Sequence, residues 1–500
     1  MRGGKQLITA ACIAAIITAY CLVFGSAGTI TTGNTITPTP ANASIAIDAF
    51  SAQATETDST VSDNPADADY ARLFDDTLTH HITIYISQEE WDGLSQDMLD
   101  YQEIDSLMRT GNYRHADLVY EDEQGVIELK DVGFRTRGNT TRILPENETG
   151  YHRAHFALKF DETFDLQKGS AEYRTLKYRQ FCGLNQLDLK WNLWTDLSHI
   201  HELYCYALLQ QAGVTASRAS LVSLDINIAG QLVHYGVYTM IEPVDEAFLV
   251  RRFGKLGSSG NLYKCLWEKS PATLEDGYAP DEIGVKDWET GYRPTYDLQT
   301  NEEYATTWDL ESFIDNINKL NGEEFAWYME CNFEVDQFLR LMAVNMLVGT
   351  PDDYRSTGNN YYLYFNKAGK IEMIPCDYDA SLGGGWNGGL SYEAIATEDV
   401  YTALNLNEVY LERATAHPLL DKLLAIPEYR EQYEYYVWYF ADTGMFSYAS
   451  FAEKFKALEA LYGKYACSDT QDHGEAMTLT IEEWYFATKT DSILSQLPEG

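Results

Sequence analysis

Carboxylate and amide side chains gather around one stretch of the chain and are of the types that phosphoryl transfer requires. Asp352 and Asp353 precede Asn360, and Asp377 and Asp379 follow it after two apolar runs. In such a set, one carboxylate orients an attacking hydroxyl, while an amide and a second carboxylate hold Mg²⁺ against the phosphates of a nucleotide. The alternative is a pair of ordinary turns, because Asp and Asn are among the commonest turn residues.

The two apolar runs between these residues predict a β-hairpin. Residues 361–365 and 371–374 have the composition of strands, and the turn between them contains Gly369. Helical patterns are found before and after this strand pair. We therefore expect the hairpin to present the acidic residues together.

A second group of candidate residues is basic and lies upstream. The segment Gly133–Arg142 runs from a strand into a turn rich in Gly, Asn and Thr, and it carries Arg135, Arg137 and Arg142. Backbone N–H groups and guanidinium groups near one turn can bind phosphate. The alternative is an ordinary hairpin with solvated arginines.

Lys159 and Glu202 are a candidate ion pair beside a nucleotide. Lys159 lies in an expected strand over residues 155–160, and Glu202 lies in the next expected helix. A lysine on a strand and a glutamate on the helix that follows can pair across a nucleotide cleft. Taken singly, each is an ordinary surface charge.

The elements that would position these residues change type along the chain. One helix is expected in the first half, over residues 196–212, because its apolar residues recur on one face and Gly213 follows them. Alternating or continuous apolar runs predict strands around this helix, at residues 81–86, 116–120, 126–137, 155–160, 220–228 and 232–241.

The second half is expected to be mainly helical. Residues 254–291 are rich in Gly, Lys, Asp and Glu, and we expect a long irregular insertion there. Helical periodicity follows at residues 307–320, 332–347, 417–424, 428–440 and 451–465.

The N-terminus predicts export. Arg2 and Lys5 precede an uncharged, mostly apolar run over residues 7–24, and small residues follow it. The pattern is typical of a signal peptide cleaved after Ala27, and the run is also long enough to remain as an uncleaved membrane anchor. Residues 28–69 are rich in Thr, Ser, Ala, Asn, Asp and Pro, so we expect a disordered linker.

The composition indicates a folded, acidic protein. Of the 500 residues, 45% are apolar and 13% aromatic, which is enough to build a core. The 36 basic and 76 acidic residues give a net charge of −40, which disfavours a nucleic acid as partner. A nucleotide remains compatible with this charge, since it arrives with its own Mg²⁺ and binds within a local site.

Six cysteines would remain after cleavage at Ala27, and they do not indicate a zinc site. None is spaced as Cys-x-x-Cys, and no histidine cluster lies near them. An oxidising compartment permits disulfide bonds, but a core of this size does not need them, and no pairing is favoured.

Taken in order, four blocks of the sequence resemble the CotH kinase family, the spore-coat protein H type of atypical protein-kinase-like enzymes. The resemblance spans about residues 80–465, and the order and spacing of the blocks make it specific. The blocks are Gly133–Arg142; Leu187–Lys190 through Asp196 to Val214; Gly236–Asp245 through Gly260–Lys264; and Asn360–Tyr364 through Pro375–Asp379.

This resemblance implies an α+β fold with the two lobes of an atypical protein kinase. A β-rich N-lobe would cover residues 70–245, an insertion and lobe connection residues 246–300, and a mainly helical C-lobe residues 301–490. It also implies an enzyme that binds ATP and Mg²⁺ and transfers the γ-phosphoryl group to Ser, Thr or Tyr hydroxyls of exported or surface proteins. Contact with a membrane would come only through residues 7–24, if they are retained.

The resemblance also assigns residues to the nucleotide. It implies a turn over the phosphates at Arg137, Gly138 and Asn139; Lys159 on the nucleotide-contacting strand, with Glu202 as its partner; Glu242 near the hinge that meets the adenine; and Lys264 as a second basic residue.

On the catalytic side, the resemblance implies that Asp352 orients the acceptor hydroxyl. Asn360 and Asp377 would hold the metal, with Asp379 close behind. The loop from Asp352 to Asn360 is longer than the family pattern, which leaves the choice between Asp352 and Asp353 open, although an aromatic residue two positions later favours Asp352.

A second hypothesis is a non-catalytic scaffold for a surface or coat assembly that keeps the fold as a binding module. The Thr-rich linker and the acidic surface motivate it, and a fold alone does not prove activity. Mg²⁺-dependent binding of ATP discriminates between the two hypotheses, because a scaffold has no need of it.

Overall fold

The computed structural model describes residues 65–193, 195–304, 306–384, 391–404, 406–472 and 474–498, and residues 58–500 form one compact unit. The expected signal or anchor, and residues 28–64 of the expected linker, lie outside the described residues. The predicted linker extends too far, because helix α3 (Pro65–Leu73) begins before residue 69. Among the described helices, none combines the length and the apolar character needed to cross a bilayer.

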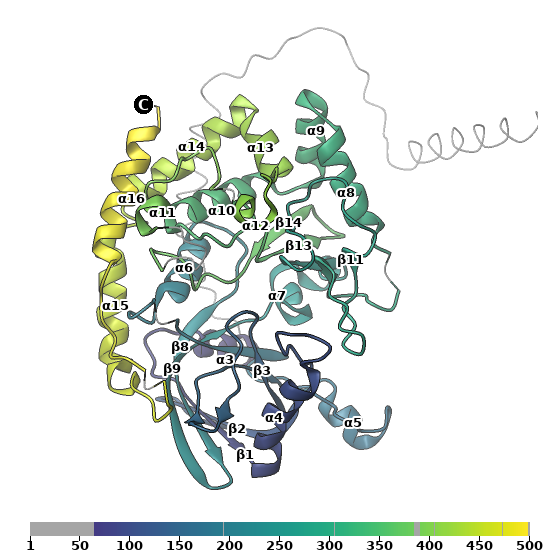
Figure 1. The fold of residues 1–500 in the computed structure, drawn as a ribbon, viewed down its shortest axis with the longest axis vertical. Helices are drawn as coiled ribbons and strands as arrows, with labels where there is room; N and C mark the ends of the chain where they lie inside the picture. Colours follow the sequence, from purple (N-terminus) through teal and green to yellow (C-terminus); the bar gives the residue numbers. More distant parts are fainter. Residues whose placement is uncertain are drawn as a thin grey trace, which may run out of the picture. The chain divides into compact units, whose positions relative to one another are not determined.

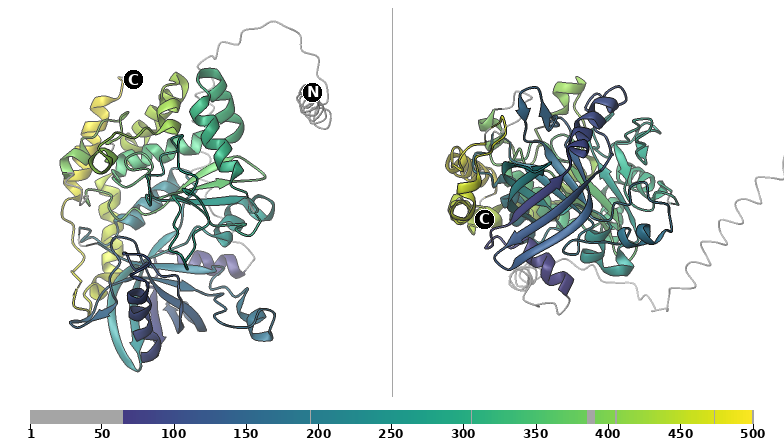
Figure 2. Two further views of the ribbon diagram at one scale, coloured as in Figure 1. Left: turned by 45° about the vertical axis from the view of Figure 1, so that its right-hand side comes forward. Right: turned by 90° about the horizontal axis from the view of Figure 1, so that it is seen from below.

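Seven strands of the N-terminal half close into a barrel in the order β1-β2-β3-β6-β7-β9-β8 (Figure 2). Neighbouring strands are antiparallel except for β1 and β8, which are parallel. All strands predicted in this half are confirmed, and the structure adds β7. The barrel strands are β1 (His81–Ile86), β2 (Arg114–Asp122), β3 (Gly125–Arg137), β6 (His155–Lys159), β7 (Gln186–Trp191), β8 (Ala219–Ile228) and β9 (Gln231–Ile241).

Apolar side chains at every second position fill the barrel. On β3, β6 and β7 the inward side chains include Phe134, Phe156 and Leu189, all fully buried in one core cluster. Because side chains alternate between the two faces of a strand, Arg137 and Lys190 lie on the outer face. The alternation that builds the core thus also places two basic groups on one external surface.

A five-stranded sheet of order β11-β12-β10-β13-β14 contains the predicted hairpin. Its strands β13 (Tyr361–Phe365) and β14 (Ile371–Pro375) are antiparallel, with Tyr361 opposite Pro375. The prediction of an irregular insertion over residues 254–291 is wrong in part, because that segment contains strands of this sheet. Strand β10 pairs with β13, in a distant part of the chain, so the local composition does not reveal it. The remaining strands are β10 (Asn261–Cys265), β11 (Ile283–Gly284) and β12 (Tyr296–Leu298) here, and the separate pair β4 (Glu146–Asn147) and β5 (Gly150–Tyr151).

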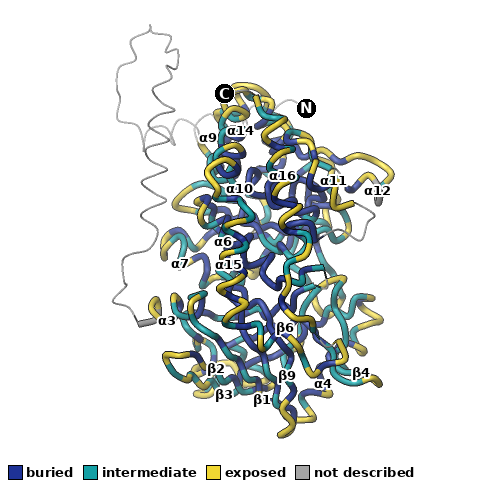
Figure 3. The backbone as a smooth tube through the Cα atoms, turned by 90° about the vertical axis from the view of Figure 1, so that its left-hand side faces the viewer, coloured by how far each residue is buried: buried dark blue, intermediate teal, exposed yellow. Residues whose placement is uncertain are grey.

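The C-terminal half is mainly helical and is built around α10 (Val335–Val348). Most residues of α10 are apolar and buried on every side of the helix, which is typical of a core helix (Figure 3). In Figure 1 the barrel strands lie on one side of α6 (His201–Gln211), and α10 lies on the other. The other helices are α4 (Gln88–Tyr101), α5 (Ala171–Leu176), α7 (Glu246–Gly257), α8 (Trp308–Lys319), α9 (Gly322–Asn332), α11 (Tyr392–Ala396), α12 (Asn407–Leu411), α13 (Pro418–Leu424), α14 (Pro427–Asp442), α15 (Tyr448–Tyr462) and α16 (Glu482–Gln496).

The helix predicted from residue 196 begins later, at His201. The reason is that Asp196 accepts hydrogen bonds from the backbone N–H groups of His199 and His201, at 2.9 and 3.0 Å, and so holds a turn before the helix. The helices α3, α4, α5, α7, α9, α11, α12 and α16 were not predicted.

The coarse prediction of a mixed α+β chain, β-rich in its N-terminal part and helical in its C-terminal part, is confirmed. All six cysteines that the structure describes are free: Cys182, Cys205, Cys265, Cys331, Cys376 and Cys467.

An ion pair fixes α3 to the barrel and makes the stability of the fold sensitive to acid. The Asp122 carboxylate accepts hydrogen bonds from Arg72 Nε at 2.6 Å and from the hydroxyl of Tyr120 at 2.7 Å. Burial raises the pKa of Asp122, but these bonds outweigh burial and lower that pKa to about 2. The resulting stabilisation is fully present above the unfolded pKa of about 4 and is lost as the pH falls through about 2.

We therefore expect Asp122→Asn to lower the free energy of unfolding at pH 7 by about 1–3 kcal/mol. The difference in the free energy of unfolding between variant and parent should shrink as the pH falls from about 5 towards 2, because the Asp122 carboxylate of the parent then gains a proton. Urea denaturation at a series of pH values measures both effects, and a difference that stays constant down to pH 2 would contradict the assignment.

Candidate active site

The site is built around Lys190, which is buried between three carboxylates. Its Nζ lies 2.8 Å from Oε2 of Glu202 and 3.3 Å from Oδ2 of Asp379, and it is hydrogen-bonded to Oδ1 of Asp377. Only 7% of Lys190 is exposed. Burial alone would lower the pKa of this amine, but the surrounding carboxylates raise it well above its ordinary value, so Lys190 is a buried cation.

The strand register explains why Lys190 occupies this position. Arg137 on β3 lies opposite His155 on β6. Phe156 on β6 lies opposite Leu189 on β7, and these strands are antiparallel. The residues next to this pair, His155 and Lys190, are therefore neighbours on the outer face. Basic side chains of three adjacent strands therefore form one row. The guanidinium of Arg137 is held in this row by Asp188, with Nη2 and Oδ2 3.1 Å apart.

Glu202 lies in the first turn of α6 and bridges two parts of the site. Its Oε1 accepts a hydrogen bond from Lys190 at 3.0 Å and another from the backbone N–H of Tyr378 at 3.3 Å. Burial raises the pKa of Glu202 to about 7, against the opposing charge of Lys190. The helix that carries Glu202 is thereby attached both to the barrel and to the segment that follows β14.

The predicted pairing of Lys159 with Glu202 is wrong. Lys159 Nζ pairs with Glu162 at 2.9 Å and lies 5.5 Å from the centroid of the Tyr113 ring, while Glu202 pairs with Lys190. Lys190 was the functional residue missed at the sequence level. The alternation of Leu187 and Leu189 with polar residues could have found it, because that pattern places Lys190 on the polar face of a strand.

The hairpin of β13 and β14 brings Asn360 and Asp377 to one end. Asn360 precedes β13 and Asp377 follows β14, and the N–H of Cys376 donates to the carbonyl oxygen of Asn360 at 3.0 Å. Both residues adopt left-handed backbone conformations, with φ of 55° for Asn360 and 65° for Asp377. Asn and Asp tolerate this region better than other side chains with a Cβ, and such strain is concentrated at functional sites.

Asp352 faces this end of the hairpin. Its carboxylate accepts hydrogen bonds from the side-chain amides of Asn359 and Asn360, both at 2.9 Å, and from the hydroxyl of Thr357 at 3.0 Å. The amide nitrogen of Asn360 is thus committed to Asp352. The loop from Asp352 to Asn360 is longer than the family pattern, and its residues Thr357 and Asn359 make two of these hydrogen bonds.

Asp353 faces away from the site into the helical half. It is 5% exposed and accepts hydrogen bonds from Asn345 Nδ2 and from the backbone N–H of Ser356, both at 2.8 Å. The structure therefore brings Asp352, and not Asp353, to Asn360.

The carboxylates of the site outnumber the cations that contact them, an imbalance that fits a divalent metal. Burial raises the pKa of Asp352 to about 7, with the charges of Asp377 and Asp379 adding to the effect. Burial also raises the pKa of Asp377, but the charge of Lys190 outweighs it and lowers that pKa to about 2. Oxygen ligands with surplus negative charge are what Mg²⁺ prefers, and Asn360, Asp377 and Asp379 are placed to provide them.

A second imbalance, of positive charge, lies at the turn after β3. The Arg142 guanidinium donates to the carbonyl oxygen of Gly138 at 3.2 Å and to the hydroxyl of Thr136 at 3.0 Å, and it has no carboxylate partner among the described residues. Burial, with the neighbouring charges of Arg135 and Arg137, lowers the pKa of Arg142 to about 9. Mutually repelling guanidiniums at a turn fit a polyanion such as a triphosphate.

The other residues expected at the nucleotide are placed as follows. Gly138 begins the turn with φ of 109°, and the side chain of Asn139 accepts a hydrogen bond from Arg109 at 3.0 Å. Lys264 on β10 lies 5.7 Å from the centroid of the Tyr362 ring, and burial lowers its pKa.

Glu242 lies in the connection between β9 and α7, as a hinge residue would. Its carboxylate is saturated by other groups, with Arg251 and Arg252 each at 2.8 Å and the hydroxyl of Tyr70 at 2.7 Å. The side chain therefore ties this connection to α7 and α3.

A family model described as CotH kinase protein matches residues 134–488. The chain belongs to the CotH kinase family. The matched range begins on β3, beside the arginine turn, and contains every residue of the site described above.

One curated relative of this CotH kinase family member is spore coat protein homolog 1 of Rhizopus delemar, which is 21% identical over 318 residues. The match covers 58% of this chain and 44% of that protein, so the chain spans less than half of the relative's length.

The central position of Lys190 makes its removal costly to the fold. We expect Lys190→Met to lower the free energy of unfolding by about 3–5 kcal/mol, because it leaves the buried Glu202 and the partly exposed Asp377 and Asp379 without their cation. The control is Lys159→Met: the Lys159 side chain is 30% exposed in a pair with Glu162, and its loss should cost less than about 1 kcal/mol. Urea denaturation at pH 7 compares the two, and equal losses would contradict the central placement of Lys190.

Proposed function

We propose that this chain is an ATP- and Mg²⁺-dependent protein kinase that phosphorylates Ser, Thr or Tyr hydroxyls of exported or surface proteins. The observation that carries the proposal is the convergence of the Lys190–Glu202 ion pair with Asp352, Asn360 and Asp377. Phosphoryl transfer needs these parts: a lysine fixed by a glutamate, an acid for the acceptor, and two metal ligands.

In this proposal Lys190 and the arginine turn bind the phosphates of ATP. Lys190 is held in place by Glu202, and Arg142 is half-buried without a carboxylate partner among the described residues, so both are pre-organised for an anion. When bound, Mg²⁺ would neutralise charge that develops on the transferred group.

Asp352 orients the acceptor hydroxyl. Its carboxylate is fixed by Thr357, Asn359 and Asn360, which reduces the motion that would misalign the attacking oxygen. Asn360 has committed its nitrogen to Asp352, and its amide oxygen is the atom that we assign to the metal, with Asp377 and Asp379.

The finer fold proposed is that of a two-lobed atypical kinase. The barrel corresponds to the N-lobe and the helical half to the C-lobe, and residues 242–245 connect β9 to α7 between them. The basic row of the barrel and the carboxylates of the helical half are thereby brought to opposite sides of one site.

Export is part of the proposal and rests on the N-terminal pattern at residues 7–24, as a cleaved signal or a retained anchor. The name of the fungal relative, a spore coat protein homolog, favours coat-type surface proteins as the acceptor class.

The proposal predicts transfer of γ-labelled phosphate to the protein itself or to a Ser-rich acidic acceptor in the presence of Mg²⁺. Asp352→Asn and Asp377→Asn should each reduce the rate by at least about a hundredfold, because each removes a group needed in the transition state. Asp491→Asn, at an exposed position of α16, is the matched control and should transfer like the parent. Retained transfer in either site variant would overturn the roles assigned. A parent that neither transfers label nor binds Mg·ATP would favour the scaffold.

Binding of the nucleotide tests the arginine turn separately. Arg142→Gln should weaken binding of Mg·ATP by about 10- to 100-fold, because a charged hydrogen bond to phosphate is lost. Without nucleotide the variant should be at least as stable as the parent, since repulsion with Arg135 and Arg137 is relieved. Arg174→Gln, at an exposed position of α5, is the control. Isothermal titration calorimetry gives the affinities, and an unchanged affinity in Arg142→Gln would contradict the phosphate role.

A further inference from the structure

The C-terminal helix α16 presents three buried polar side chains on one face. Glu482, Tyr485 and Lys489 follow one another at intervals of three and four, the spacing of one helix face, and each is no more than 1% exposed. Each contacts a different segment of the chain, and each of those segments leads directly into the site.

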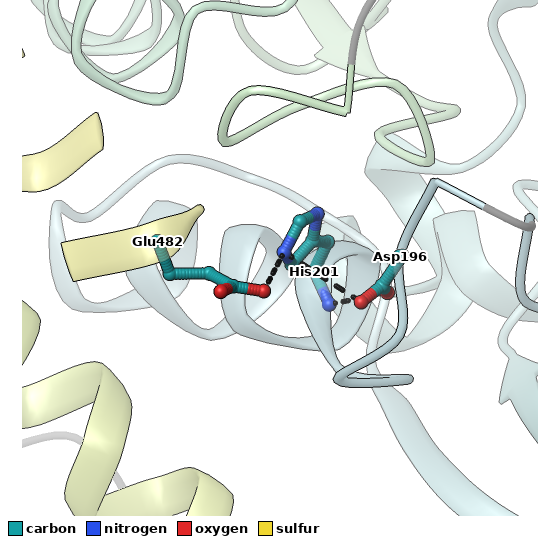
Figure 4. A group of neighbouring side chains, drawn as sticks. All are labelled: Asp196, His201 and Glu482. Atoms are coloured by element: carbon teal, nitrogen blue, oxygen red, sulfur yellow. Dashed lines mark hydrogen bonds and ion pairs between the residues drawn. The ribbon is translucent and has the colours of Figure 1, made fainter. Parts of the chain in front are cut away.

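Glu482 is attached to the helix that carries Glu202. Its Oε1 lies 3.1 Å from Nε2 of His201, the residue before Glu202, and Nε2 is also 3.6 Å from Oδ1 of Asp196 (Figure 4). Burial alone would lower the pKa of His201, but these two carboxylates outweigh burial and raise that pKa above its ordinary value.

This cluster is better explained as an ion pair than as a metal centre. The carboxylate of Asp196 already accepts hydrogen bonds from the hydroxyl of Ser198 at 2.6 Å and from two backbone N–H groups of the turn before α6. The other oxygen of Glu482 accepts from the backbone N–H of Thr480 at 2.5 Å. Oxygens that are occupied in this way have little capacity left for a metal, whereas Nε2 of His201 already lies within ion-pair distance of both carboxylates.

Lys489 is attached to the loop that carries Asp352. Its Nζ contacts Oε1 of Glu398 at 2.9 Å, and the other oxygen of Glu398 contacts Nη2 of Arg355 at 2.7 Å. Arg355 lies within the loop between Asp352 and Asn360. Arg355, Glu398 and Lys489 are 2%, 4% and 0% exposed, so the triad is shielded from water and from the screening by salt that weakens surface pairs.

Tyr485, between the two, fixes the end of α10. Its hydroxyl donates to the carbonyl oxygen of Leu347 at 3.0 Å. The same hydroxyl lies against Gly349, and a Cβ atom added to Gly349 would come within 2.1 Å of the hydroxyl oxygen. Gly349 has a left-handed φ of 60° and ends α10. The chain then continues from Gly349 into the loop of Asp352.

We propose that Glu482 and Lys489 of α16 are positioning residues, which hold α6 with Glu202 and the loop with Asp352 in fixed relation to each other. The inference rests on the proposed function and deepens it. Buried ion pairs add little net stability compared with well-packed apolar residues, but they restrict the geometry of the elements that they join. Here two such networks join one helix to the two elements that supply opposite sides of the site.

The test compares Glu482→Gln with Glu483→Gln, its exposed neighbour in the same helical turn. Glu482→Gln should lower kcat by about 10- to 100-fold with a smaller change in the KM for ATP. The reason is that a misplaced Glu202–Lys190 pair reduces the stabilisation of the transition state more than it reduces the affinity for ATP. It should also speed amide hydrogen exchange at residues 202–206 of α6. Glu483→Gln should match the parent in all three measurements.

A second pair of variants tests the other network. Lys489→Arg should retain most of the activity, because the charge and its contact with Glu398 can be kept, while Lys489→Met should lose it and speed exchange in residues 352–360. If Lys489→Met does not fold, Glu482→Gln alone decides the question.

Hydrogen exchange separates this proposal from the proposed function, because it needs no substrate. Unchanged exchange in α6 of Glu482→Gln would overturn the positioning role, whatever the activity of the parent. Faster exchange in α6 together with an unchanged kcat would also overturn it. A parent without phosphoryl transfer would overturn the kinase proposal, and Glu202 would then be positioned for another purpose.

Discussion

The contact of Lys190 with Glu202, Asp377 and Asp379 is the interaction on which the rest of the site depends. The lysine comes from a barrel strand, the glutamate from α6, and the aspartates from the segment after β14. A buried cation must be balanced by nearby carboxylates, and the buried carboxylate of Glu202 in turn needs the cation. The three segments are therefore held together by a mutual requirement, and the barrel and the helical half meet at this point.

The acidic character of the whole chain makes the distribution of its charges informative. Although the net charge is −40, the turn after β3 gathers arginines that, together with burial, lower the pKa of Arg142, while the opposite side of the site gathers carboxylates. Like charges held close together raise the free energy of the empty site. A ligand that brings the complementary charges removes this repulsion when it binds. ATP with Mg²⁺ carries both negative and positive charge. One ligand can therefore complement both the arginines of the turn and the carboxylates of the opposite side, so the two groups support a single function.

The same reasoning explains the buried networks around α16. The helix lies after the last predicted element and outside the four blocks that first suggested the family, yet it contacts the residue before Glu202 and, through Glu398, a residue close after Asp352. Kinase-like chemistry requires two halves of a site to keep a fixed geometry while they carry opposing charges. A helix that bridges both halves from behind meets that requirement without occupying the site.

The sequence by itself determined the local features. Apolar patterns predicted every barrel strand except β7, and the hairpin predicted that Asn360 and Asp377 would meet, because these features depend on neighbours in the chain. Tertiary structure decided the partners: Lys190 rather than Lys159 for Glu202, Asp352 rather than Asp353 for Asn360, and α16 as a link between the halves. These choices depend on strand register and on which charges are buried together, and both are set by contacts between residues far apart in the sequence.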